Sequence, residues 1–416
     1  MRAPIARDPY AVFRIRDFRL ALASKFFVTL GVQMQSVVVG WQIYQLTKDP
    51  LALGLIGLAE ALPYIGCLLW AGHQTDRSEK RRMILWAEGG LFLCAFLLLA
   101  LSKTRSPWPL YGVIGLTGVC RSFLWPSATA YVDMTIPQAI YSKAAGWNST
   151  LWQVGAILGP ALGGWIYAVS DASHAYLAVV ASLGVAVWFA TRLAPKLAVA
   201  PNSAESGWSG LWGGIRFVFS HQAILGALSL DMFAVLFGGA EALLPIFADR
   251  MQVGSSGLGL LRAALPAGAL VVALYQSHRP PFRRTGRALL VGVSLFGLCM
   301  VLFPLSHLFP LSLLLLAAAG AADNVSVVIR ASILQAMTPN RLRGRVASVN
   351  GFFIGSSNEI GAFESGLAAK LLGVVPSVML GGMMTWVCVL VTAWRAPALR
   401  QLRLQYDPVA GEPTTP

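Results

Sequence analysis

Residues 84–102 read ILWAEGGLFLCAFLLLALS, an apolar run in which Glu88 is the one charged side chain. A helix needs roughly 20 such residues to cross a hydrocarbon core of about 30 Å. Similar runs recur along the chain, and because they are continuous rather than alternating, they predict helices and not barrel strands. The whole sequence is 56% hydrophobic and 12% charged, against about 25% charged in an ordinary soluble domain. We therefore expect an all-α polytopic membrane protein.

The sequence contains enough apolar runs for twelve membrane-spanning helices. The predicted spans are 22–46, 51–74, 84–102, 108–133, 146–169, 174–193, 222–248, 255–276, 288–306, 309–332, 347–371 and 375–394.

The net charge of +14 follows topology rather than forming a nucleic-acid-binding patch, so no nucleic-acid partner is expected. Lys and Arg gather in alternate loops, such as 77–82 and 341–345, and the opposite loops contain few. That asymmetry is the positive-inside pattern. It predicts a multi-pass membrane protein with both termini in the cytosol. The first residues, MRAPIARDPYAVFRIRDFR, are too polar for the apolar part of a signal peptide.

One offset of 202 residues aligns the first half of the chain with the second. Under it Asn148 meets Asn350, Gly159 meets Gly361, and the pair Arg81-Arg82 meets Arg283-Arg284. The repeat predicts two related six-helix bundles over 1–194 and 221–394, joined by a cytosolic linker over 195–220 and followed by a cytosolic tail over 395–416. In such parallel repeats the substrate site lies between the halves, near the bilayer midplane.

The loop at 72–82 reads GHQTDRSEKRR. It resembles the G-x-x-x-D-R-x-G-R-[KR]-[KR] loop of the major facilitator superfamily, although Glu79 stands where that family usually has Gly. The resemblance assigns a gating role to Gly72, Asp76, Arg77 and Arg81. Read without it, the segment is an ordinary basic cytosolic loop.

A second motif, GAILGPALGG at 155–164, is similar to the G-x-x-x-G-P-x-x-G-G motif of the superfamily's proton-coupled exporters. Small residues spaced four apart let two helices touch backbone to backbone, and Pro bends a helix. The conformational residues of this motif are Gly155, Gly159, Pro160 and Gly163. The alternative is a generic packing seam without a role in antiport.

Two further stretches, 40–47 and 357–366, resemble the branch of the superfamily that contains the enterobactin exporter. The resemblance implies the twelve-helix major facilitator fold and a proton gradient in place of a bound cofactor. It also implies alternating-access efflux of a small amphipathic solute, such as a siderophore, a drug or a metabolite. The transporter would work as a monomer within the lipid bilayer of the bacterial inner membrane. A proton-coupled importer or a lipid translocase on the same fold stays open. A membrane-embedded enzyme or receptor is disfavoured, because the sequence has no G-x-S-x-G, no P-loop and no metal-ligand spacing.

Ionisable residues inside membrane segments are costly, at about 2.5–3.5 kcal/mol each, and are functional candidates by default. Glu60 is the leading candidate for the proton carrier, because a carboxyl desolvated among Leu, Ile and Ala favours its neutral form; the alternative is a static salt bridge. Asp231 and Glu359 are the other carboxyl candidates. Glu88 and Arg330 lie near cytosolic helix ends, where snorkelling is the simpler account.

The repeat also pairs opposite charges, since Glu60 falls on Arg262 and Arg121 on Asp323. From this we expect Arg121 to approach Asp323 or Asp231 across a cavity. In the resembled fold the first, fourth, seventh and tenth helices line that cavity. The predicted substrate contacts are Gln33, Gln42, Tyr44, Arg121, Asp231 and Asp323.

Overall fold

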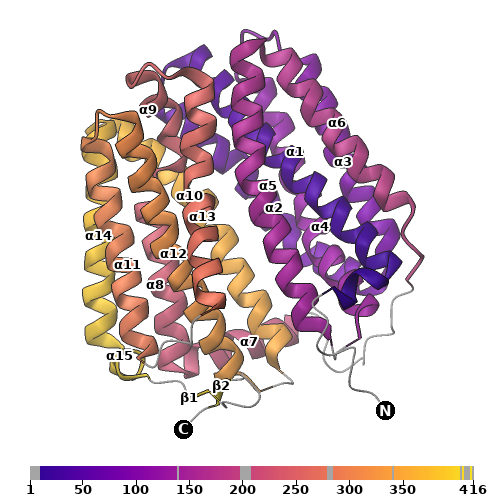
Figure 1. The fold of residues 1–416 in the computed structure, drawn as a ribbon, viewed down its shortest axis with the longest axis vertical. Coiled ribbons are helices and arrows are strands. Elements are labelled where there is room, and N and C mark those ends of the chain that lie inside the picture. The colour runs from indigo at the N-terminus through magenta and orange to yellow at the C-terminus, as the bar shows by residue number, and fades with distance from the viewer. Residues whose placement is uncertain are drawn as a thin grey trace. The chain divides into compact units, whose positions relative to one another are not determined.

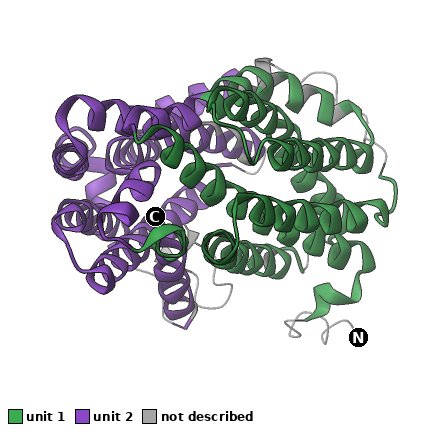
Figure 2. Cartoon of the chain, turned by 90° about the horizontal axis from the view of Figure 1, so that it is seen from above, with its two compact units in different colours: residues 1–48, 59–204, 253–263 green, residues 49–58, 205–252, 264–416 purple. Residues whose placement is uncertain are grey.

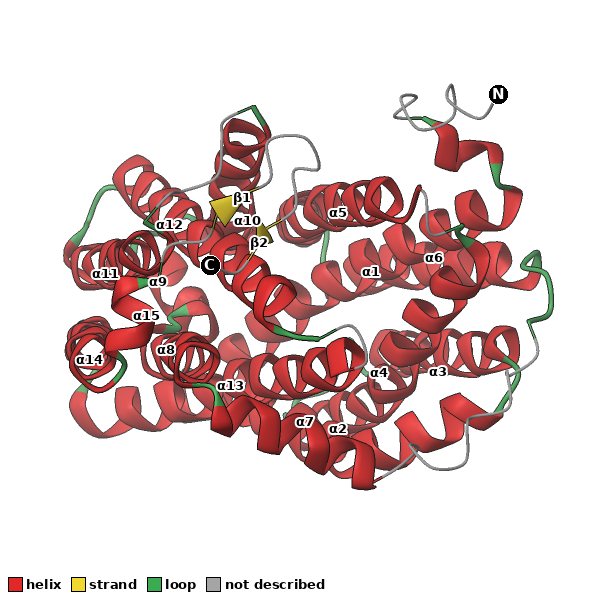
Figure 3. Cartoon of the chain, turned by 90° about the horizontal axis from the view of Figure 1, so that it is seen from below, coloured by secondary structure: helices red, strands yellow, loops and turns green. Residues whose placement is uncertain are grey.

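The computed structural model describes residues 10–137, 140–196, 208–278, 284–339, 342–402, 405–406 and 413–414. These residues are almost entirely helical, as predicted (Figures 1 and 3). The strands described are β1 (Gln405–Tyr406) and β2 (Pro413–Thr414), which form a short antiparallel pair in the C-terminal tail.

The first half of the chain forms six long helices after a short 3-10 turn, η1 (Ala11–Arg14). They are α1 (Arg16–Thr47), α2 (Pro50–Arg77), α3 (Lys80–Ala100), α4 (Trp108–Thr135), α5 (Tyr141–Val169) and α6 (Ala172–Thr191). Each contains its predicted run to within two residues, because a long apolar stretch in lipid must satisfy its backbone hydrogen bonds within the segment.

The second half repeats this order after α7 (Trp208–Ser220), a helix within the predicted linker. Its elements are α8 (Gln222–Gly238), η3 (Glu241–Leu243), α9 (Leu244–Arg250), α10 (Gly254–Ser277), α11 (Thr285–Leu302), η4 (Phe303–Leu305), α12 (Phe309–Met337), α13 (Arg343–Leu372), α14 (Val374–Arg395) and α15 (Pro397–Gln401). Helices α5 and α13 begin at 141 and 343, and α4 and α12 end at 135 and 337, so both intervals equal the sequence offset of 202.

The predicted helix over 222–248 is interrupted, and this corrects the sequence expectation. Helix α8 ends at Gly238, and α9 begins only at Leu244. Gly238 and Gly239 lower helix propensity at the break, and Pro245 lies in the first turn of α9, where its missing N–H costs nothing.

Nine helices among the described residues are long and apolar enough to cross a membrane, with α8 to α9 counted as one span. Helices α4, α5 and α13 do not meet that hydropathy threshold, although they contain 28, 29 and 30 residues. They are rich in Gly, Ser, Trp and other residues of low hydropathy. The count of twelve spans and the orientation of the termini stay predictions.

The chain forms two compact units (Figure 2). Unit 1 comprises 1–48, 59–204 and 253–263, and unit 2 comprises 49–58, 205–252 and 264–416. Each unit therefore contains the beginning of a helix, α10 or α2, whose remainder belongs to the other unit. The domain boundaries predicted from the repeat stay a prediction; within the predicted linker, 197–207 lies outside the described residues.

Inside unit 1, α1 packs against α5 and α6, and α3 packs against α4 and α6. An apolar cluster at this junction includes Val28, Leu91, Val179 and Leu183. In unit 2, α8 packs against α13 and α14, and α11 against α12 and α14. Helices in lipid associate through such close packing and interhelical hydrogen bonds, and in unit 1 this arrangement fixes the face of α1 that borders the site described next.

Candidate functional site

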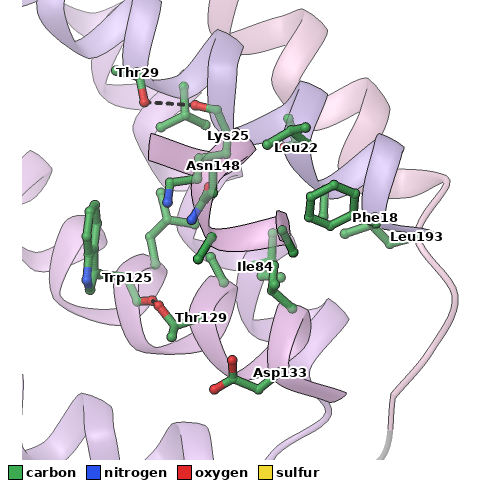
Figure 4. A pocket seen from close by; sticks show the side chains of 18 of the residues that line it. Phe18, Leu22, Lys25, Thr29, Ile84, Trp125, Thr129, Asp133, Asn148 and Leu193 are labelled. Carbon is green, nitrogen blue, oxygen red and sulfur yellow. Dashed lines mark hydrogen bonds between the residues drawn. The ribbon is translucent and has the colours of Figure 1, made fainter. Parts of the chain in front are cut away.

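Unit 1 contains a pocket of about 130 Å³ lined by α1, α3, α4 and α5 (Figure 4). A cavity of about 150 Å³ binds a molecule of benzene, so this one holds a group of the size of a single ring. Its lining includes the apolar side chains Phe18, Leu22, Ile84, Leu124 and Trp125 and the polar side chains Ser24, Lys25, Thr29, Glu88, Thr129, Asp133, Tyr141 and Asn148.

Lys25 is the basic residue of the pocket lining. Its ammonium lies 4.9 Å from the centre of the Trp125 ring, a geometry in which cation and aromatic face attract by about 0.5–2 kcal/mol. Figure 4 shows Lys25 and Asn148 near the middle of the pocket, with Trp125 on one side and Phe18 on the other. The pocket can therefore accept an aromatic ring that carries polar substituents.

Glu88 corrects a sequence expectation. The residue is 3% exposed, and its Oε1 accepts a hydrogen bond of 2.6 Å from the Ser24 hydroxyl. Snorkelling would carry the carboxylate to water, whereas here it is buried and bonded to Ser24 of α1. Lys25 and Asn148 are absent from the sequence candidates, although a lysine inside the apolar run 22–46 was a usable signal.

The glycine motif of α5 sets the distance between α5 and α1. A Cβ added at Gly159 would lie 2.6 Å from the Gln33 Cβ and 2.9 Å from the Leu30 carbonyl oxygen, and one added at Gly163 would lie 3.0 Å from the Met34 Cα. A Cβ added at Gly155 would lie 3.0 Å from the Thr29 Cγ2. Helix α5 continues through Pro160. The predicted backbone contact is therefore present, and its partner is α1.

The beginning of α10 packs on the adjacent face of α5. A Cβ added at Gly164 would lie 2.9 Å from the Gly259 Cα, and one added at Gly259 would lie 3.2 Å from the Gly164 Cα. Unit 2 has a similar contact between Gly54 and Gly366, where a Cβ added at Gly54 would lie 2.9 Å from the Gly366 Cα. Gly366 is the equivalent of Gly164 at the offset of 202. Small residues at these two contacts let the helix backbones meet directly.

Gln42, a predicted substrate contact, is buried with its amide hydrogen-bonded inside unit 1, and its role in substrate contact stays a prediction. It is 4% exposed; its Oε1 accepts from the Tyr176 hydroxyl at 2.6 Å, and its Nε2 donates to the Ser102 carbonyl at 3.0 Å. Both ends of the amide thus hold α1 to neighbouring segments. Gln33 lies in the α1–α5 seam, and Tyr44 is buried with its ring 4.3 Å from the Lys48 ammonium.

Glu60 on α2 forms an ion pair with Arg121 on α4. The partner expected for Arg121 was Asp323 or Asp231, so that expectation is corrected: the partner is within unit 1. The side chains are 16% and 39% exposed, respectively. This geometry matches the salt-bridge alternative for Glu60, and its role as proton carrier stays a prediction.

Exchanging the two charges in the double variant Glu60→Arg/Arg121→Glu is expected to recover the transport that each single variant loses. Each single variant places two like charges side by side, which is costly in a partly desolvated site. Uptake by vesicles, normalised to the amount of inserted protein, measures the effect. A double variant no more active than the singles, at equal protein level, would contradict the pairing.

Asp231 on α8 forms a buried ion pair with Arg330 on α12; the two residues are 7% and 4% exposed. This also corrects two expectations, the partner of Asp231 and the snorkelling of Arg330. An arginine that reached the interface would be exposed, whereas this one stays beside a carboxylate inside unit 2. Its aliphatic neighbours include Ile329 and Ile333.

The remaining acidic candidates lie in unit 2. Asp323 is half-buried on α12 and has no ion pair or hydrogen bond with any described residue. Glu359 lies on α13, where its carbonyl oxygen would be 2.6 Å from a Cβ added at Gly57. The proposed roles of both carboxyls in substrate contact or proton coupling stay predictions.

The basic loop motif is partly described. Glu79 has an extended backbone with φ of −61°, so the missing glycine is not required there, and its carboxylate pairs with Arg82 at 2.9 Å. Arg81 donates to the Thr191 carbonyl at 2.8 Å, which joins α3 to the end of α6. Arg77 is exposed. The side chain of Asp76 lies outside the described part, and no described atom lies within 4 Å of a Cβ added at Gly72.

Comparison with known families decides the identity of the fold. The family model described as Major Facilitator Superfamily matches residues 21–362. The chain belongs to the Major Facilitator Superfamily. It is therefore a secondary transporter rather than an enzyme, and a bacterial multi-pass membrane protein.

Curated relatives of this superfamily member include the enterobactin exporter EntS of Shigella boydii and that of Escherichia coli. Each is 26% identical over 370 residues, which cover 87% of this chain and 86% of the relative. The similarity to the branch suggested by 40–47 and 357–366 is thus confirmed along most of the chain.

Solved structures of other superfamily transporters share the fold. A POT family transporter in complex with 5-aminolevulinic acid has a TM-score of 0.73 at 11% identity and covers 92% of this chain and 96% of its own. The nucleoside transporter NupG has a TM-score of 0.67 at 12% identity and covers 92% and 99%.

Proposed function

We propose that this protein exports a small amphipathic solute from the bacterial cytosol, driven by proton entry through alternating access. The observation that carries the proposal is the pocket of unit 1, because it combines an aromatic face with a lysine and an amide. Those groups suit a solute with a ring and polar substituents. The pocket is smaller than the 300–1,000 Å³ usual for drug-sized ligands, so it takes one part of a larger molecule.

Two observations support export as the direction. The glycine motif of α5, which resembles that of proton-coupled exporters, forms close backbone contacts in the structure. The curated relatives are also described as exporters of enterobactin. On this proposal the protein works as a monomer in the inner membrane with both termini in the cytosol. It needs no bound cofactor and no nucleic acid, because the proton gradient supplies the energy.

Transport into inside-out membrane vesicles tests the proposal. Enterobactin is the first solute to test, with a panel of aromatic drugs and metabolites beside it. A vesicle lumen made acidic should drive accumulation of a transported solute, and dissipating the pH gradient should abolish it. Accumulation driven by an alkaline lumen would indicate import instead, and movement of labelled phospholipid without any solute would indicate a lipid translocase.

The pocket itself is tested by Trp125→Leu. Loss of the aromatic face is expected to raise the apparent KM by a few-fold to about tenfold, because such contacts contribute about 0.5–1.5 kcal/mol, with kcat little changed. The matched control is Trp165→Leu, at an exposed tryptophan on α5 that does not line the pocket. Equal KM values in the two variants would exclude the pocket from solute binding.

A further inference from the structure

The Ser24 hydroxyl makes two contacts that need two hydrogen atoms. Its Oγ lies 2.6 Å from Glu88 Oε1 and 3.1 Å from the Ala186 carbonyl oxygen. A carbonyl and a carboxylate can only accept, and serine has one hydroxyl hydrogen. If the Glu88 carboxyl is protonated, its O–H donates to Ser24, and the Ser24 hydrogen is free to donate to Ala186. The acid form of Glu88 therefore supplies one hydrogen for each of these two contacts.

The surroundings of Glu88 also disfavour a permanent charge. The second oxygen, Oε2, is fully buried without a hydrogen-bond partner among the described residues, and the carboxyl forms no ion pair with them. An uncompensated buried charge is expensive. The titratable groups that line the same pocket as Glu88 are Lys25 from α1, Asp133 from α4 and Tyr141 from α5. Helix α6 contributes the Ala186 carbonyl, which accepts from Ser24.

Lys25 and Asp133 line the same pocket as Glu88, and the pocket gives the carboxyl a route for proton exchange. Lys25 lies over Trp125, and Tyr141 donates to Asp133 at 2.6 Å. Both ionic groups near Glu88 therefore have contacts of their own. A deeply buried acid with an adjacent cavity and no fixed counter-charge has the features of a site that gains and loses a proton.

The internal repeat shows how the surroundings of Glu88 differ from those of Asp231, the buried acid of unit 2. Positions Thr29 and Ala128 of the pocket correspond, at the offset of 202, to Asp231 and Arg330. In unit 2 these positions are filled by a buried ion pair, whereas in unit 1 the smaller side chains border the pocket. Glu88 in turn corresponds to Leu290. Among the described residues, the buried acid of unit 2, Asp231, is thus paired with an arginine, whereas that of unit 1, Glu88, is hydrogen-bonded to a serine.

We propose that Glu88 is the proton-binding carboxyl of this transporter and that Ser24 positions it. On proton uptake the carboxylate forms an O–H bond and donates to Ser24 Oγ, while the Ser24 hydrogen moves from the carboxylate to the Ala186 carbonyl. Release reverses both changes. The inference rests on the proposed proton-coupled export only in assigning the bound proton to transport. The proton-binding site itself does not depend on which solute is carried.

The site is tested without solute by infrared difference spectra of the purified full-length protein between alkaline and acidic pH. The wild type should show a protonated carboxyl band that Glu88→Gln removes. Glu60→Gln is the matched control and should retain the band, since Glu60 is paired with Arg121. A band that persists in Glu88→Gln, or a wild-type spectrum without one, would overturn the assignment. The amide of Gln can still donate to Ser24, and this preserves the packing.

Transport then separates the two proposals. A gradient of one pH unit supports about tenfold accumulation for each proton carried. Glu88→Gln is expected to abolish that accumulation yet retain downhill solute exchange, and Glu88→Asp should recover part of it. Uphill transport retained in Glu88→Gln would overturn the role of Glu88 while leaving proton-coupled export intact. A wild type with the Glu88 band but no pH-driven transport would contradict the proposed function and leave the proton site standing.

Discussion

Gly159→Leu is expected to abolish transport and to lower the unfolding temperature of the solubilised protein. A Cβ at this position would lie 2.6 Å from the Gln33 Cβ and 2.9 Å from the Leu30 carbonyl oxygen, so the two helix backbones must separate. Overpacking of this kind costs about 1–3 kcal/mol and occasionally more. Because α1 carries Ser24 and Lys25, its displacement would also distort the pocket of unit 1.

Gly146→Leu is the matched control on the same helix. Apart from the backbone of its own helix and its chain neighbours, no described atom lies within 4 Å of a Cβ added at Gly146. Replacing Gly in a helix also gains up to about 1 kcal/mol of helix propensity. This variant should transport normally and unfold at or above the wild-type temperature. If Gly159→Leu behaved like Gly146→Leu in both assays, the close packing of α1 on α5 would be wrong.

The helices and the repeat could be predicted from sequence because both depend on local patterns. Hydropathy identifies segments that lipid can solvate, and the offset of 202 relates the helix ends of the two halves. The glycines at 155, 159 and 163 predicted close contact because their spacing places them on one helix face. Even the break after Gly238 had a signal, the pair Gly238-Gly239 followed by Pro245.

The partners of the charged residues could not be predicted in the same way. The sequence shows that Arg121 lies inside a span but does not give the rotation of α4 about its axis, which brings it to Glu60 on α2. The repeat suggested an approach to Asp323 because the two positions are equivalent, yet equivalence by symmetry does not require contact. Asp231 likewise pairs with Arg330, whose position along α12 suggested snorkelling.

The pocket could not be predicted from the sequence either, for a related reason. Depth along a helix estimates how far a group lies from the interface, but burial depends on which helices surround it. Glu88 is close to one end of α3, yet it is buried and bonded to Ser24 of α1, which also contacts the Ala186 carbonyl of α6. Only the packed structure shows that these three residues meet.

Arg330→Ala is expected to have the second large effect, a loss of about 3–5 kcal/mol of stability, because it leaves the Asp231 carboxylate buried without its counter-charge. Asp231 and Arg330 are 7% and 4% exposed, so neither group can be solvated in place. Thermal unfolding of the purified protein in detergent measures the loss, together with the amount of protein recovered from membranes.

The Glu60–Arg121 pair provides a comparison within the same chain. The side chains of Glu60 and Arg121 are 16% and 39% exposed. Water therefore screens this ion pair, and it stabilises the charge that remains when one partner is removed. Arg121→Ala should therefore destabilise the protein less than Arg330→Ala. The reverse order would mean that burial does not determine the cost of losing these arginines.

Replacing both members of the buried pair should restore most of the stability. In Asp231→Leu/Arg330→Met the two charges are exchanged for apolar side chains of similar size, a change that is often neutral or stabilising in other buried pairs. The repeat supports this expectation, since unit 1 has the uncharged residues Thr29 and Ala128 at the equivalent positions. If the double variant is as stable as the wild type but does not transport, the pair serves function; if it also transports, its role is confined to structure. A double variant less stable than Arg330→Ala alone would contradict the account, because no unpaired charge would remain to explain the loss.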